Sequence, residues 1–152
     1  MRRKDKEIND IADIENIINR ASVCRLGLCE NEHPYIVPLC FGYKDNTLYF
    51  HSAPEGRKLD ILKKNNNVCF EFDIDHDLAK AEKACDWGMK YQSVTGFGKA
   101  VVIDDTEAKR KALDVIMGNY SNRSFTYPTE TIRNTAIIKV QIQSMTGKKS
   151  GY

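Results

Sequence analysis

The sequence predicts a mainly β domain of the α+β class, an antiparallel barrel with helices around it. Five or six stretches are extended and apolar or alternate apolar with polar residues, which is typical of strands. Short turns join most of them, and the few helices do not alternate regularly with strands as a doubly wound parallel sheet requires. A length of 152 residues suits a single domain, residues 1–152, with a substantial core.

The first half of the chain supplies one helix and three strands. Apolar residues recur at helical spacing between Asn9 and Ala21, which predicts an amphipathic helix. Val23–Cys29 is apolar apart from one arginine, and Tyr35–Tyr43 alternates along its whole length, so both are expected to be strands. A turn then leads into a third strand at Thr47–His51.

The second half continues in the same way. A helix is expected at Arg57–Asn65, followed by an alternating strand, Val68–Asp75, with one buried and one wet face. Tyr91–Ile103 is another extended stretch, and Thr106 begins a helix after two aspartates. Alternation over Ala136–Gln143 predicts the last of six strands.

Composition excludes several classes of protein. With 23 basic and 21 acidic residues the net charge is +2, which gives no electrostatic case for binding nucleic acid. The chain has no apolar run of the roughly 18–20 residues that span a bilayer, so no membrane partner is expected. The basic start lacks the apolar stretch of a secretory signal, so we expect the protein in the cytoplasm.

The five cysteines predict reduced thiols rather than a disulfide framework or a metal site. They are scattered, odd in number and contain no Cys-x-x-Cys pair. Cys24, Cys29 and His33 lie close in sequence, but their spacing matches no standard zinc pattern. We therefore expect no metal ion.

Arg57 and Lys58 open a predicted helix, where the partial positive charge of the helix end makes cations unfavourable. A phosphate held by the helix end, a hydroxyl and both cations would explain their position. The alternative is that both side chains are simply solvated. Ser52 is the candidate hydroxyl, although Ser52-x-x-Glu55 also matches a capping box, in which Ser52 would only cap the helix. Gly56 would permit an unusual turn or a close backbone approach.

Three further residues mark irregular places in the predicted strands. Pro38 cannot donate to a sheet ladder, so its strand is expected to lie at an edge or to be interrupted, which would leave backbone groups free for a flat polar ligand. Gly96 and Gly98 indicate either a bulge or the close approach of another group.

Longer motifs carry a resemblance to a known family. They are Pro34-Tyr-Ile-Val-Pro-Leu-Cys-Phe-Gly-Tyr43, Tyr49-Phe-His-Ser-Ala53 and Gly56-Arg-Lys-Leu-Asp60, supported by Tyr91-Gln-Ser-Val94 and Met145-Thr-Gly-Lys148. In this order they resemble the FMN-binding split-barrel superfamily. Within it, the match is to the nitroimidazole-resistance branch related to pyridoxamine phosphate oxidase.

The resemblance implies a six-stranded Greek-key split barrel that forms a homodimer, with FMN in two clefts at the interface. Arg57 and Lys58 would bind the FMN phosphate with help from Ser52, and the strand Ile36–Leu39 would run along the flavin ring. The implied cofactor-binding residues are Ile36, Val37, Pro38, Leu39, His51, Ser52, Arg57, Lys58, Gln92 and Ser93.

The chain departs from the oxidase pattern in two places. An Arg-x-x-x-x-Lys pair of the oxidases falls on Ile36 and Phe41, so the phosphate charge would rest more on Arg57 and Lys58. The arginine-rich C-terminal segment that holds pyridoxal phosphate has no counterpart before Tyr152. Oxidation of vitamin B6 is therefore disfavoured.

These features predict an FMN-dependent reductase that passes two electrons from a reduced donor, such as NADH or NADPH, to a small aromatic acceptor, such as a nitro compound. His51 is the candidate catalytic residue, suited to supplying a proton near neutral pH, and its alternative role is to pack against the flavin ring. Two other functions remain open. One is a flavin-binding module without turnover, and the other is a haem-binding split barrel, although haem has no phosphate for the two cations.

Overall fold

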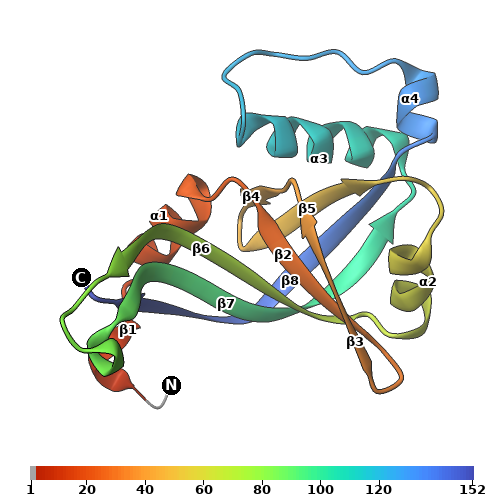
Figure 1. Ribbon diagram of the computed structural model, residues 1–152. Coiled ribbons are helices and arrows are strands. Elements are labelled where there is room, and N and C mark those ends of the chain that lie inside the picture. The colour runs from red at the N-terminus through yellow and green to blue at the C-terminus, as the bar shows by residue number, and fades with distance from the viewer. Residues whose placement is uncertain (1–2) are drawn as a thin grey trace.

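The computed structural model describes residues 3–152, which form an antiparallel sheet with helices around it (Figure 1). Within these residues the sheet has eight strands, in the spatial order β3-β2-β6-β7-β8-β5-β4, with β1 paired to β8. The strands are β1 (Glu7–Ile8), β2 (Cys24–Glu30), β3 (His33–Leu39), β4 (Gly42–Lys44), β5 (Thr47–Ser52), β6 (Asn67–Ala79), β7 (Gly88–Ile103) and β8 (Ala136–Ser150). The helices are α1 (Ile11–Arg20), α2 (Arg57–Lys64), α3 (Thr106–Gly118) and α4 (Thr129–Arg133), with 3-10 turns at Lys4–Lys6 and Ala84–Asp86.

The predicted class is confirmed, but the predicted number of six strands is wrong. The stretch Tyr35–Tyr43, predicted as one strand, divides into β3 and β4. The eighth strand is β1, whose two residues pair with Lys148 and Gly147 of β8 and are too few to produce an alternating pattern. The remaining strands occur where the sequence predicts them, although β6 and β8 run further than their apolar alternation.

β3 and β4 are consecutive in sequence, but they lie at opposite ends of the spatial order of strands in the sheet. β3 pairs with β2 and β4 pairs with β5, so the chain crosses between the two edges of the sheet at Cys40 and Phe41. Phe41 is fully buried at this crossing, 4.8 Å from the ring of Phe72. Its backbone N–H donates to Tyr120 Oη at 2.9 Å, and Tyr120 in turn donates to the Ser22 carbonyl at 3.0 Å.

The inner face of the sheet and two amphipathic helices form the main core. Apolar side chains alternate inward along the strands, as Leu26, Phe70, Val94 and Val140 do. The apolar sides of α1 and α2 add Ile14, Ile17, Ile18, Leu59, Ile61 and Leu62. Figure 1 shows α1 and α2 near opposite ends of the sheet.

On the other face of the sheet, α3 covers β4, β5 and part of β8. Ala112 and Ile116 of α3 pack on Ile137 of β8 in a separate small cluster. Gly42 lets the helix approach, because a Cβ there would lie 2.6 Å from the backbone nitrogen of Ile116. The rest of this outer face, over β3, β2, β6 and β7, carries no helix in Figure 1.

The irregular residues of the sequence occur where the fold needs them. β3, with Pro38, is an edge strand of the described sheet, as predicted. A Cβ on Gly98 would lie 2.5 Å from the Gln141 carbonyl oxygen, and the β7–β8 register shifts between Phe97 and Gly98. At Gly96 a Cβ would collide with the Phe70 ring. Both predicted causes, a bulge and a close approach, are therefore present.

The longest helix of the described residues, α3, has 13 residues, and none of their helices has the length and apolar character needed to cross a bilayer.

We expect the substitution Tyr120→Phe to lower the free energy of unfolding by about 1–3 kcal/mol, because it leaves the buried Phe41 N–H and the Ser22 carbonyl without this partner. Urea denaturation measures the change. Tyr49→Phe is the control, since the Tyr49 hydroxyl has no hydrogen bond within residues 3–152. An equal free energy of unfolding in the two variants would show that the hydrogen bonds of Tyr120 do not stabilise the crossing.

Candidate functional site

The start of α2 and the edge strand β3 lie against each other. The guanidinium carbon of Arg57, the first residue of α2, lies 4.7 Å from the centre of the Tyr35 ring on β3. A cation over an aromatic face is attracted to it, which fixes Arg57 beside the strand that precedes the crossing. The structure thus brings the predicted phosphate-binding residues next to the predicted flavin-lining strand.

The helix α2 begins without a side-chain cap. Gly56 is its N-cap, with φ of 131°, and no side chain there accepts a hydrogen bond from the first turn. The backbone N–H groups of Arg57 and Lys58 have no partner within the helix, as in the first turn of any α-helix. The alternative reading of Ser52 as a capping residue is wrong, because Ser52 is the last residue of β5 and pairs with Ala136.

Lys58 is a partly buried cation, and its ammonium group makes no hydrogen bond or ion pair within residues 3–152. Burial lowers its pKa, since removal from water disfavours the charged form. An anion beside it would reverse that effect. The Lys58 ammonium group is therefore unfavourable in isolation and suited to a negatively charged ligand.

Two carboxylates near α2, Glu30 and Asp60, have lysine partners. Lys64 Nζ lies 2.8 Å from Glu30 Oε1, and Lys63 Nζ lies 3.3 Å from Asp60 Oδ1. The pKa of Glu30 is lowered, chiefly by the hydrogen bond from Lys64, with a smaller effect of Arg57. A shallow cavity of 540 Å³ lies over this group and includes Arg57.

The strand Ile36–Leu39 presents two kinds of surface. The side chains of Val37 and Leu39 pack against the core, while Ile36 is 66% exposed and Pro38 is exposed on the outer face. As an edge strand, β3 also has one row of N–H and C=O groups without strand partners. It can therefore offer backbone hydrogen bonds and an apolar surface to a planar ring.

His51 and Ser52 end β5, directly before the loop that leads to α2. His51 is exposed on the outer face, across from Ile137 of β8, and Ser52 is half-buried. The imidazole makes no hydrogen bond within the described chain, so both ring nitrogens are available.

Gln92 and Ser93 point to opposite faces of β7 and differ in their surroundings. Gln92 Nε2 already donates to Asp75 Oδ2 at 2.8 Å. Ser93 is on the outer face, between Asp73 of β6 and Lys148 of β8 in the sheet register. Of the two, Ser93 is the one available to a ligand.

Ser93 lies far from Ile36 of the same chain. Across the sheet, Ile36 aligns with Gly27, Cys69 and Phe97, and Ser93 is four residues from Phe97 along β7. Strand geometry then puts Ser93 about 13 Å along the strands and about 14 Å across them from Ile36. One chain does not bring Ser93 to the same ligand as Ile36.

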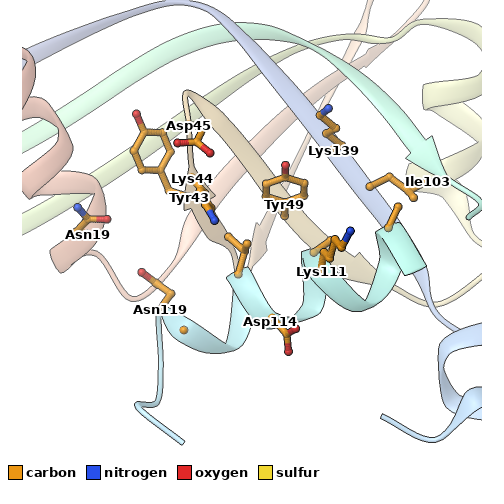
Figure 2. A pocket seen from close by; sticks show the side chains of 14 residues that line it. Asn19, Tyr43, Lys44, Asp45, Tyr49, Ile103, Lys111, Asp114, Asn119 and Lys139 are labelled. Carbon is orange, nitrogen blue, oxygen red and sulfur yellow. The ribbon is translucent and has the colours of Figure 1, made fainter. Parts of the chain in front are cut away.

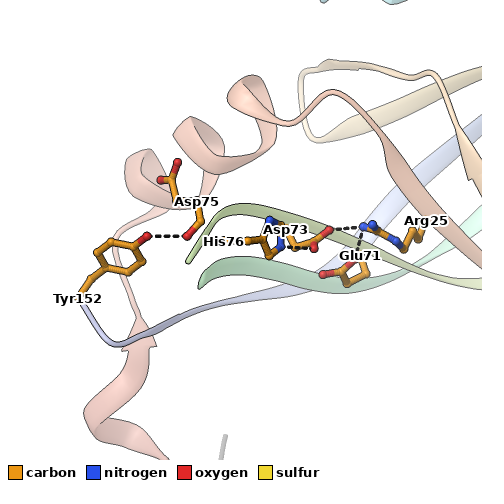
Figure 3. Close-up of polar contacts among 6 residues, drawn as sticks. All are labelled: Arg25, Glu71, Asp73, Asp75, His76 and Tyr152. Atoms are coloured by element: carbon orange, nitrogen blue, oxygen red, sulfur yellow. Dashed lines mark hydrogen bonds and ion pairs between the residues drawn. The ribbon is translucent and has the colours of Figure 1, made fainter. Parts of the chain in front are cut away.

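Sequence reasoning missed a polar network on the outer face beside Ser93 (Figure 3). Arg25 bridges Asp73 and Glu71, 3.2 Å from the latter, and His76 also contacts Asp73. Burial, followed by the charge of Asp73, raises the pKa of Glu71. The polar, turn-like sequence around His76 indicated only a solvated side chain. The acidic residues at alternate positions of β6 were a signal of a polar face in the sequence. Their partners could not be predicted, because they depend on the β2–β6 register.

This network borders a cavity of 420 Å³ that includes Ser93, Tyr91 and Lys148. Lys148 Nζ donates to Tyr91 Oη at 2.6 Å. Trp87, just before β7, is 47% exposed and donates to the Ala81 carbonyl. The outer face around Ser93 is therefore polar and hollowed.

Comparison with known proteins places the chain in a family. The family model described as pyridoxamine 5'-phosphate oxidase matches residues 10–149. The crystal structure of a candidate 5-nitroimidazole antibiotic resistance protein from Bacteroides thetaiotaomicron is 42% identical, with a TM-score of 0.85 over 94% of this chain and 86% of that one. This agrees with the branch that the motifs indicated.

Two further relatives are more distant. An FAD- and haem-binding protein from Mycobacterium smegmatis shares the fold, with a TM-score of 0.88 over 97% of this chain and 74% of that one, at 18% identity. The Rhizobium meliloti (strain 1021) protein RA0666 is 30% identical over 59 residues, which are 39% of this chain and only 38% of that protein. From the match over residues 10–149, the chain belongs to the pyridoxamine 5'-phosphate oxidase family.

Proposed function

We propose that this protein is an FMN-dependent oxidoreductase that reduces a small aromatic acceptor, such as a nitro compound, in a cleft between two copies of the chain. The observation that carries the proposal is the cation pair Arg57 and Lys58 at the uncapped start of α2, next to the exposed edge of β3. The family supports flavin chemistry, and the 42% identity to a candidate nitroimidazole resistance protein supports the class of acceptor.

The residues at the start of α2 fit the phosphate of FMN. A phosphate monoester carries nearly two negative charges near neutral pH. Arg57 and Lys58 supply two positive charges, their backbone N–H groups lack helical partners, and Ser52 adds a hydroxyl at the end of β5. Haem offers only separate propionate carboxylates, whereas FMN offers one phosphate with nearly two charges, so the same residues favour FMN over haem.

Each part of the chain then has a defined task. Bound FMN would supply the two-electron chemistry, and the protein would supply orientation and protons. The backbone edge of β3 would hold the ring, and the Tyr35 ring would keep the Arg57 guanidinium in place. The exposed imidazole of His51, which has no hydrogen bond within the described chain, would donate a proton to the acceptor.

A second copy of the chain would complete the cleft. Apolar side chains are exposed together on the outer face of the sheet, with Ile36 at 66%, Phe97 at 58% and Val101 at 53%. Exposed apolar patches on a folded protein mark interaction surfaces. If two copies pack through this face, Ser93 of the partner subunit can approach a ring lying on β3, which Ser93 of the same chain cannot.

We expect the double substitution Arg57→Ala and Lys58→Ala to weaken FMN binding at least about a hundredfold, because charge-assisted hydrogen bonds contribute about 1.5–3 kcal/mol each. Quenching of flavin fluorescence during titration measures the affinity. Riboflavin, which lacks the phosphate, should bind the variant and the parent protein equally.

The matched control is Lys63→Ala with Lys64→Ala, which removes the same charge from the last turn of the same helix. It should leave the FMN affinity nearly unchanged. An equal loss in both double variants would mean that general charge attraction, rather than this phosphate site, holds the cofactor.

The dimer proposal is tested with Phe97→Asp, which puts a charge in the middle of the exposed apolar face. We expect sedimentation equilibrium to show a shift from dimer to monomer, because burying an unpaired carboxylate is costly. Phe125→Asp, at an exposed phenylalanine outside this face, should leave the parent state intact. A parent protein that sediments as a monomer would contradict the proposal.

The activity itself is tested by mixing FMN-loaded protein with NADPH or NADH without oxygen and then adding a nitroaromatic compound. We expect the flavin absorbance near 450 nm to bleach with the donor and to return with the acceptor. Bound flavin that neither donor bleaches would indicate a binding module without turnover. A Soret band in the purified protein would indicate the haem-binding alternative.

A further inference from the structure

A separate cavity of 770 Å³ lies between α3 and the strands β4, β5 and β8 (Figure 2). Its apolar wall includes Tyr49, Ile103 and Ala112, which belong to the small cluster under α3. None of the candidate flavin-binding residues lines it. The cavity is therefore separate from the proposed flavin site.

Three lysines from three different elements line this cavity. They are Lys44 of β4, Lys111 of α3 and Lys139 of β8, and Lys139 is the direct cross-strand neighbour of Tyr49. None of the three ammonium groups makes a hydrogen bond or ion pair with residues 3–152. On the same helix, by contrast, Lys109 donates to the Thr135 carbonyl at 2.8 Å.

The carboxylates of the cavity do not neutralise these lysines. Asp45 and Asp114 belong to the lining, but neither lies within 4.0 Å of a lysine nitrogen in the described chain. In Figure 2, Lys111 and Lys139 lie on the side of Tyr49. The part of the cavity around Tyr49 is thus positively charged and has an aromatic wall.

We propose that this cavity binds a small organic anion, with a carboxylate or phosphate group among Lys44, Lys111 and Lys139 and an aromatic body against Tyr49 and Ile103. These three lysines line one cavity without an anionic partner, and an anion there would accept charge-assisted hydrogen bonds from them. An aromatic ring would remove the apolar wall from water and so stabilise the complex, whereas an inorganic ion would not. Such an anion would occupy this site while the flavin occupies its own.

The test is a calorimetric titration at low salt with 2-aminobenzoate, an aromatic carboxylate, and with 2-aminobenzamide, a neutral compound of the same shape. FMN is present in excess, so that flavin-site binding cannot produce the signal. We expect 2-aminobenzoate to bind at least about tenfold more tightly than the amide, since loss of the charge removes the lysine contacts. Inorganic phosphate should bind more weakly than 2-aminobenzoate.

The matching variants are Lys44→Gln, Lys111→Gln and Lys139→Gln combined, against a control with Lys80, Lys83 and Lys149 all changed to Gln. The control removes the same charge from exposed lysines outside the cavity. We expect the first variant to lose 2-aminobenzoate binding at least about tenfold and the control to keep it. All six side chains are at least partly exposed, so both variants should fold, and circular dichroism checks this.

Equal affinity for the acid and the amide, an equal effect of both triple variants, or no 2-aminobenzoate binding at millimolar concentration would overturn the proposal. Binding that disappears as FMN is added would assign the anion to the flavin site instead. The lysines lie outside the flavin site. If the protein did not bind FMN, the titration with 2-aminobenzoate would therefore still test this proposal.

Discussion

The fold depends on the crossing at Cys40 and Phe41, where the chain passes from one edge of the sheet to the other. Phe41 fills the core at this point, and its backbone N–H is held by the hydroxyl of Tyr120, beyond the end of α3. This contact fixes β3 and β4 at opposite edges while they remain consecutive in sequence. As a result β3 has a free edge. The loop that follows β5 brings the start of α2 beside that edge.

The same geometry explains the chemistry that we propose. The Arg57 guanidinium can stack on Tyr35 only because α2 starts beside β3, and the helix end has no cap, which leaves donors for an anion. Lys58 is poorly solvated without a ligand, so a phosphate would relieve a cost already present in the fold. In the proposed dimer, the bare outer face would provide both the apolar surface for a second copy and the position of Ser93.

Local patterns in the sequence predicted α1, α2, α3 and most strands but not the short helix α4, and the motifs predicted the family. The break before β4 could not be predicted, because Leu39, Phe41 and Tyr43 continue the apolar alternation through the crossing. The capping-box reading of Ser52 failed because β5 extends to that residue and the helix starts later. The separation of Ser93 from β3 follows from strand order and register, which a single sequence does not contain.

The central claim is that the cation pair at α2 of one chain and Ser93 of the partner subunit contact the same flavin. Complementation tests it most directly. Two variants that should bind FMN only weakly, one with Arg57→Ala and Lys58→Ala and the other with the bulky change Ser93→Trp, are unfolded together, refolded as mixed dimers and titrated with FMN. A shared cleft predicts that the mixture regains tight FMN binding that neither parent has, because one cleft of each mixed dimer is intact. No recovery in mixed dimers of proven composition would show that each chain builds its site alone and would contradict the account.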